Sequence, residues 1–240
     1  MSEILDVIQA RHSSRGPFDP NHPVSAASQR LILEAARWAP TPANMQNFEI
    51  IVVDSRERID ALEKIPAEMS EKFLRENYQQ LSFSEQDLHA KKTGMLATDF
   101  PEAWTNPEAW DPYSDTRSQL SFLARPIGET PLMLIVLYDS TKRAPGSDGD
   151  PVGLISLGCV MENMWLMCES LGVGVHVITV VSNGPVEALM RDVLHIPKEM
   201  NVAFACCLGY TVDATPDYSR VRRDLDSFVH HDDFGQRLAD

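Results

Sequence analysis

Apolar residues recur at helical spacing in the first part of the chain. Residues 2–12 place apolar side chains on one face behind Ser2, a candidate N-cap, and predict a short helix. A second helix is predicted from about Ser25 to Pro40, because apolar positions again follow helical spacing and proline ends a helix. Residues 48–53 are apolar apart from Glu49 and mostly β-branched, which predicts a short buried strand.

The second half of the chain alternates apolar strands with helices. Asp150 followed by Pro151 marks the start of a long helix, and apolar residues cover most of its surface, so we expect a buried central helix. Gly172 and Gly174 are expected to cap its C-terminus. The remaining predicted elements are strands at 132–138, 175–181 and 202–209 and a small helix at 186–194. This order indicates an α+β or α/β sandwich.

The middle of the chain and its tail differ from these segments. Residues 55–125 are polar and mixed, and the tail after Tyr210 is too poor in apolar residues to form a core. We therefore predict a single domain over residues 1–240 with an insertion or lid at about 66–125 and a C-terminal extension at about 211–240. The aromatic residues expected to cover a pocket, if they do not simply pack on a peripheral helix, are Trp104, Trp110 and Tyr113.

Composition narrows the class of protein. The chain has 240 residues, with 21 Lys plus Arg against 35 Asp plus Glu and a formal net charge of -14. This acidic balance argues against broad contact with nucleic acid or an anionic membrane. Glu3 and Asp6 argue against a signal peptide or membrane anchor at the start, and no uninterrupted apolar run near 20 residues predicts a transmembrane helix.

The cysteines and histidines give little sign of catalysis or metal binding. The four cysteines lie in apolar stretches without a CxxC pair, so we expect neither a disulfide framework nor a zinc site, and a reducing cytoplasm fits best. His230 and His231, beside two aspartates, fit a solvated segment, because adjacent residues rarely converge on one ion. Phosphate-loop and GxSxG motifs are also missing from the sequence.

Three short clusters carry the candidate chemistry. Residues 11–15, RHSSR, combine cations and hydroxyls suited to a phosphate, although such a cluster alone is more often a solvated turn. Residues 39–47, APTPANMQN, form a stiff loop whose amide and hydroxyl groups can bind a flat heterocycle. Residues 218–226, YSRVRRDLD, are a basic island in an acidic chain, with a surface patch paired to neighbouring aspartates as the alternative.

Together with SLGVG at 170–174 and LGY at 208–210, these clusters resemble the FMN-dependent nitroreductase family in order and spacing. The match covers roughly residues 2–54 and 127–231 and leaves the middle segment outside it. The resemblance implies a nitroreductase-like three-layer α+β sandwich, with a mostly antiparallel central sheet flanked by helices. It also implies an intertwined homodimer with two sites at the interface.

The resemblance implies that residues from both ends of the chain bind FMN. The residues implied on its phosphate and ribityl side are Arg11, His12, Ser13, Arg220 and Arg222. Arg15 would lie near the pyrimidine edge of the ring, where a cation stabilises negative charge on the reduced flavin.

The loop after the second helix is implied to reach the flavin from the partner subunit. Its matched residues are Pro40, Thr41, Pro42, Ala43, Asn44 and Gln46. The backbone of Val180, Val181 and Ser182 would approach the ring near N5, and Arg125 is a further candidate at the edge of the insertion. Asn47 replaces the proline that is usual in the family, and substrate preference is left open.

The implied activity is that of an FMN oxidoreductase. It would take hydride from NADH or NADPH at flavin N5 and reduce a nitroaromatic, a quinone or a related conjugated electrophile by ping-pong turnover, with no side chain needed as a nucleophile. Two alternatives stay open. One is a specialised flavin enzyme of the same fold, such as a reductive dehalogenase or a flavin-fragmenting enzyme, and the other is a non-catalytic flavin-binding module.

Overall fold

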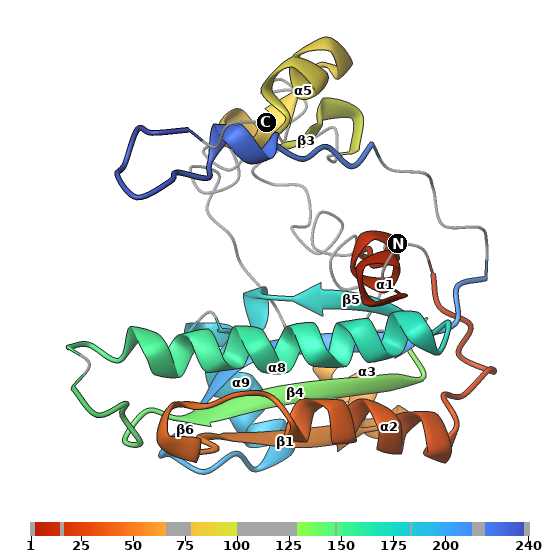
Figure 1. The fold of residues 1–240 in the computed structure, drawn as a ribbon. Coiled ribbons are helices and arrows are strands. Elements are labelled where there is room, and N and C mark those ends of the chain that lie inside the picture. The colour runs from red at the N-terminus through yellow and green to blue at the C-terminus, as the bar shows by residue number, and fades with distance from the viewer. Residues whose placement is uncertain are drawn as a thin grey trace. The chain divides into compact units, whose positions relative to one another are not determined.

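The computed structural model describes residues 3–14, 17–65, 78–99, 129–146, 148–182, 184–212 and 219–237. The chain divides into two compact units (Figure 1), which are considered separately below. The first comprises Met1–Ala67 with Leu120–Thr215, and the second comprises Glu68–Gln119 with Pro216–Asp240. The sequence-based prediction of a single domain with a lid stays a prediction.

A four-stranded antiparallel sheet forms the centre of the first unit (Figure 1). Its strands, in spatial order, are β1 (Phe48–Val53), β4 (Leu132–Asp139), β6 (Met200–Gly209) and β5 (Gly174–Ile178). All three neighbouring pairs are antiparallel. The predicted mostly antiparallel central sheet is therefore confirmed, with β1 and β5 as its two edges.

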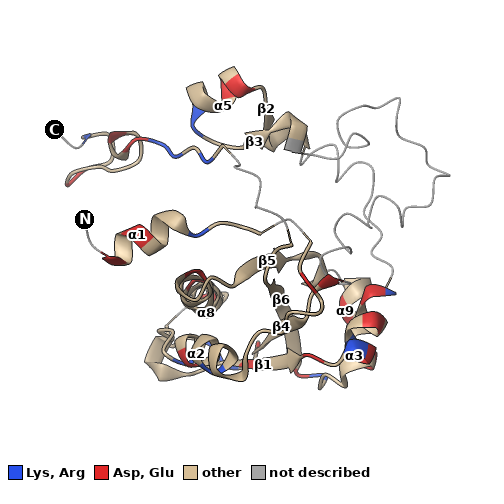
Figure 2. Cartoon of the chain, turned by 90° about the vertical axis from the view of Figure 1, so that its right-hand side faces the viewer, with Lys and Arg blue, Asp and Glu red and all other residues tan. Residues whose placement is uncertain are grey.

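Helices cover both faces of this sheet (Figure 2). On one face lie α2 (Ala26–Arg37) and α8 (Pro151–Ser170), and on the other lie α3 (Arg56–Glu63) and α9 (Gly184–Leu194). A short helix, α1 (Glu3–Ala10), contacts α8. These three layers confirm the predicted α+β sandwich.

The central strand β4 shows why the sheet carries helices on both sides. Residues 132–137 are all buried, with Leu132, Leu134 and Val136 in the core beneath α8 and the intervening residues in the core beneath α9. Successive side chains of a strand point to opposite faces, so an uninterrupted apolar run needs cover on both. The sequence LMLIVL therefore specifies a strand at the centre of a sandwich.

Helix α8 begins where the sequence predicts. Asp150 adopts a left-handed backbone with φ of 60° and accepts a hydrogen bond from Gly153 N at 3.1 Å, with Pro151 at the first helical position. Among the described residues, α8 is the one helix long and apolar enough to cross a membrane by length and composition alone, a test that a buried core helix also passes. Its packing against α2 and the sheet is that of a core helix.

The strand predicted at 175–181 is wrong at both ends. Observed β5 begins at Gly174, which was expected to belong to the helix cap, and ends at Ile178. Gly172, with φ of 67°, is the residue that closes α8. After Ile178 the chain turns into a 3-10 helix, η3 (Val180–Ser182), because Thr179 O accepts hydrogen bonds from both the backbone N and the hydroxyl of Ser182. The apolar sequence alone did not reveal this turn.

The second unit contains small elements. Its strands β2 (Ser82–Phe83) and β3 (Met95–Leu96) pair in parallel, and between them lies α5 (Glu85–Lys91). The described residues of this unit also form two 3-10 helices, η2 (Ala97–Asp99) and η4 (Leu225–Ser227). An ion pair between Lys92 and Asp224 joins its two chain segments. The expected lid residues Trp104, Trp110 and Tyr113 lie outside the described residues.

Candidate functional site

The first predicted cluster follows α1 and docks against the edge strand β5. Arg11, His12 and Ser13 leave the helix, and the backbone N of Ser14 donates a hydrogen bond to Val175 O at 2.8 Å. Glycine at position 174 permits this close approach, because a Cβ built there would lie 2.8 Å from Ser14 Oγ. The segment is therefore fixed along the first residues of β5.

Side chains of α8 hold this segment from the other side. The Arg11 Nε atom lies 3.2 Å from Glu162 Oε1, and the guanidinium carbon lies 4.6 Å from the centre of the Trp165 ring. The indole Nε1 of Trp165 also donates to His12 O at 3.1 Å. Glu169 Oε2 is 3.9 Å from His12 Nδ1. Helix α8 thus contacts both the side chains and the backbone of the cluster.

A cavity of about 340 Å³ opens beside this segment. It is lined by His12, Ser14, Trp165, Glu169, Gly172, Val173, Gly174, Val175, Tyr210 and Thr211. Its volume lies within the roughly 300–1,000 Å³ range of small-molecule sites. The wall mixes aromatic rings, hydroxyls and backbone amides, which suits a ligand with polar and flat parts.

The second predicted cluster forms a strained loop before β1. A 3-10 turn, η1 (Pro42–Asn44), is followed by Gln46, whose backbone N donates to Thr41 Oγ1 at 3.1 Å. Ala43, Asn44 and Gln46 have φ values of 49°, 54° and 46°. Left-handed backbone at non-glycine residues costs about 1 kcal/mol or more each and persists where the surroundings impose it, often at functional sites.

Asn47 anchors the end of this loop. The residue is 1% exposed, and its backbone O accepts a hydrogen bond from Asp139 N at 3.0 Å. Its Oδ1 atom is buried without a hydrogen-bond partner among the described residues. The departure from the family's proline therefore places a polar atom at the base of the loop.

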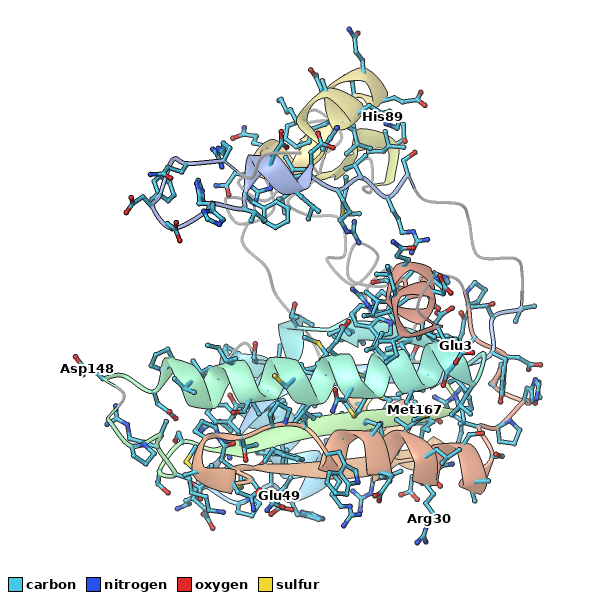
Figure 3. The ribbon with its side chains drawn as sticks, in the orientation of Figure 1. Glu3, Arg30, Glu49, His89, Asp148 and Met167 are labelled. Atoms are coloured by element: carbon cyan, nitrogen blue, oxygen red, sulfur yellow. The ribbon has the colours of Figure 1, made fainter. Side chains whose placement is uncertain are left out.

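The two clusters lie at opposite edges of the sheet. Residues 11–14 are joined to β5, whereas the Pro40–Gln46 loop leads directly into β1. Three strand spacings separate these edges, about 14 Å. The loop contacts α8 through η1. Figure 3 shows Asp148 near the start of α8 and Met167 near its other end. Helix α1, which carries Glu3, lies beside the Met167 end. One chain does not bring the two clusters together.

The other predicted residues fall into three groups. Val180, Val181 and Ser182 form η3 directly after β5, so they share an edge strand with the Arg11 segment. Arg220 and Arg222 belong to the second unit, and their role beside Arg11 stays a prediction. Arg15 and Arg125 lie outside the described residues.

The buried cysteines are unsuited to nucleophilic chemistry. Burial raises the pKa of the Cys206 thiol to about 12, and burial also raises the pKa of Cys168 and Cys207. A thiol with so high a pKa carries almost no thiolate near neutral pH. The described residues also contain no group of three or more His, Cys, Asp or Glu side chains that could hold a metal ion.

Sequence reasoning missed the α8 residues that touch the cluster. Glu162, Trp165 and Glu169 are spaced by three and four residues, so they lie on one face of the helix. Trp165 was expected only as part of the buried stripe, and it does pack against that core. The spacing of a tryptophan between two glutamates on a helix was the available signal, but it does not say which segment the helix faces.

Comparison with known proteins gives a family match. The sequence model of the Nitroreductase family matches residues 8–210. A search of curated proteins finds no matching sequence.

Solved structures give matches across nearly the whole chain. An FMN-dependent nitroreductase from Clostridium difficile is 17% identical, with a TM-score of 0.60 over 96% of this chain and 99% of that chain. A Bacteroides fragilis nitroreductase with bound FMN is 18% identical, with a TM-score of 0.54 over 88% and 90%. A Bacteroides thetaiotaomicron protein, provisionally described as an NADH dehydrogenase/NAD(P)H nitroreductase, is 16% identical, with a TM-score of 0.63 over 98% and 99%. At these identities the likeness concerns the fold.

Proposed function

The chain belongs to the Nitroreductase family, and from this premise we propose that it is an FMN-dependent oxidoreductase. In this proposal NADH or NADPH supplies electrons, and a nitroaromatic, quinone or related conjugated electrophile receives them by ping-pong turnover. The observation that carries the proposal is the docking of the Arg11–Ser14 segment on β5, through Ser14, beside a ligand-sized cavity.

The residues present suit FMN. A phosphate needs a cation and hydrogen-bond donors, which Arg11 and Ser13 supply where the chain leaves α1. The glycine at 174 lets the segment lie close to the edge strand without a side chain between them. We place the phosphate toward Arg11 and Ser13, where a cation offsets negative charge, and away from Glu169 in the cavity wall.

The protein's own part in the reaction is to bind and orient. Arg11 and Ser13 would hold the phosphate end, and the backbone of Val180–Ser182, farther along the same edge, would lie toward the ring end. FMN, when bound, supplies the electron chemistry, including hydride acceptance from a nicotinamide. No described side chain has to act as a nucleophile.

We further propose a homodimer in which the partner completes each site. The Thr41–Asn44 loop lies at the sheet edge opposite β5, so a second copy is the means of bringing it to the flavin. The exposed surface of α8 suits such a contact, because Leu154 and Ile155 expose 53% and 63% of their surface. We also place the protein in the cytoplasm, on the ground that all four cysteines are free thiols.

Steady-state turnover with a panel of acceptors tests the proposed reaction. Purified protein reconstituted with FMN is mixed with NADH or NADPH and a nitroaromatic, a quinone or a halophenol, and oxidation of the nicotinamide is followed at its absorbance band. We expect turnover with at least one nitroaromatic or quinone. Nicotinamide oxidation that is absent with every acceptor, despite bound FMN, would favour a specialised flavin enzyme or a binding module.

A further inference from the structure

Trp165 contacts the Arg11–His12 pair in two ways. Its ring faces the Arg11 guanidinium, with 4.6 Å between the guanidinium carbon and the ring centroid. Its indole Nε1 donates to the backbone O of His12 at 3.1 Å. One side chain therefore holds both the cation and the backbone that carries it, across 153 positions of sequence.

We propose that Trp165 is a positioning residue that fixes Arg11 for the FMN phosphate and so sets the preference for FMN over riboflavin. This inference rests on the proposed function, because it takes Arg11 as the phosphate ligand. Riboflavin has the same ring and ribityl chain as FMN but lacks the phosphate. A residue that acts through Arg11 therefore affects the binding of FMN and leaves that of riboflavin unchanged.

The geometry explains how the guanidinium is oriented. An aromatic ring against its face restricts the plane, and Glu162 Oε1 lies 3.2 Å from Nε as an ion pair on the same side chain. The edge formed by Nη1 and Nη2 is the edge that binds two oxygens of one phosphate. Holding a long arginine side chain in one orientation before binding removes much of the entropy that the phosphate contact would otherwise cost.

Trp165 isolates positioning better than Glu162 does. Replacing Glu162 removes a contact to Arg11 but also removes a negative charge that repels an incoming phosphate, so the two effects oppose each other. Trp165 is uncharged, so its loss changes the support of the Arg11 segment and the cavity wall without adding or removing a charge. Its substitution therefore has one expected direction.

The test compares dissociation constants for FMN and riboflavin by quenching of flavin fluorescence. We expect Trp165→Leu to weaken FMN binding about 10-fold, the loss of roughly one cation–π contact in a partly buried site, and to weaken riboflavin binding much less. Trp165→Phe keeps a ring face and is expected to recover part of the affinity. Ser170→Ala, on the exposed end of the same helix, is the control and keeps both constants.

A double-mutant cycle with Arg11→Ala gives the second measurement. If Trp165 acts through Arg11, Trp165→Leu adds no further loss of FMN binding in the Arg11→Ala background. Should Trp165→Leu fail to fold, the same cycle is run with Trp165→Phe, for which a loss of about 3-fold confined to FMN is expected.

Two outcomes would overturn the inference. Equal weakening of FMN and riboflavin by Trp165→Leu would show a structural role only, and a full additional loss in the Arg11→Ala background would show that Trp165 acts without Arg11. Failure of the wild-type protein to bind either flavin would instead overturn the proposed function, and the inference with it.

Discussion

Single atoms decide how closely the predicted phosphate segment can approach the sheet. A Cβ at Gly174 would lie 2.8 Å from Ser14 Oγ, 3.0 Å from Phe18 Cε1 and 3.1 Å from Gly209 O. The 2.8 Å distance is shorter than real Cβ atoms show, and the other two would require a packed ring and a backbone carbonyl to shift. Position 174 therefore requires glycine because of space, and not because of its φ angle.

Replacing Gly174 by alanine should loosen the Arg11–Ser14 segment. We expect Gly174→Ala to lower the free energy of unfolding by about 1–3 kcal/mol, as overpacking does, and to weaken FMN binding. Urea denaturation and a flavin titration measure the two effects. The control is Gly184→Ala, where a Cβ has open space. Unchanged stability and FMN affinity in Gly174→Ala would contradict the packing described.

Asp139 offers a pH-dependent test at the end of β4. Hydrogen bonds from the Thr141 hydroxyl at 2.6 Å and from its backbone N at 2.9 Å lower the pKa of Asp139. A folded-state pKa below the unfolded value stabilises the fold above the ordinary Asp pKa, and this contribution is lost as pH falls through the folded pKa.

Removing the Thr141 hydroxyl should move the pKa of Asp139 back toward its ordinary value. We expect Thr141→Val to be less stable than the wild type at neutral pH, with the difference shrinking as the solution becomes acidic enough to protonate Asp139. Carboxyl-carbon NMR titration measures the pKa directly. The explanation fails if Asp139 titrates at the same pH in both proteins.

At the scale of elements, the start of α8 combines a cap with an unusual backbone. Asp150 has φ of 60°, and its Oδ1 accepts hydrogen bonds from Gly153 N and from Ala144 N at 3.0 Å. Asparagine also tolerates left-handed backbone and has an oxygen that can accept, whereas alanine does neither. The carboxylate thus ties the preceding loop to the first turn of the helix.

Substitutions at Asp150 should separate these contributions. We expect Asp150→Ala to lower the free energy of unfolding by about 2 kcal/mol. The variant loses the cap and must also place an alanine in left-handed backbone. Asp150→Asn should stay within about 0.5 kcal/mol of the wild type, because it keeps both properties. Chemical denaturation compares them. Equal destabilisation by the two variants would show that the negative charge, and not the cap, matters.

Much of the element pattern could be predicted from sequence because it depends on local chemistry. Asp150 with Pro151 predicted the start of α8, and the apolar run of β4 predicted a strand with both faces buried. The end of β5 could not be predicted, since its apolar residues continue through Val181 while hydrogen bonds to Thr179 O turn the chain. Gly174 looked like a cap because its close neighbours come from distant sequence.

The sequence predicted only the part of the candidate site that belongs to a recognisable motif. Arg11–Ser13 could be found from the RHSSR cluster, and the structure places it against β5. The contacts of Trp165 with this cluster could not be found, because helical periodicity tells which face of α8 is apolar but not which segment packs there. Tertiary packing supplies that information.

At the scale of the whole molecule, net charge and local charge differ. The chain carries a formal net charge of -14, which opposes a large polyanion as partner. Figure 2 shows acidic residues on α1, α3 and α9, with basic residues on α3 as well. Arg11 lies beside α8. A small anion can therefore bind beside an arginine, although the overall charge of the protein repels a large polyanion.

The proposed homodimer can be tested through the exposed face of α8. We expect the wild type to elute as a dimer by size-exclusion chromatography with light scattering, and the Leu154→Arg/Ile155→Arg variant to be monomeric. The monomer should bind FMN at least 10-fold more weakly, because the Thr41–Asn44 loop of the partner is lost. A monomeric wild type that binds FMN tightly would contradict the proposed assembly.

Anaerobic reduction of the bound flavin tests the central claim most directly. Protein reconstituted with FMN is titrated with NADH, and separately with NADPH, while the flavin absorbance near its visible maximum is recorded. The account predicts a yellow complex that loses this absorbance with about one equivalent of at least one nicotinamide and recovers it when an acceptor is added. A protein that stays colourless after FMN addition, or a bound flavin that neither nicotinamide bleaches, would contradict it.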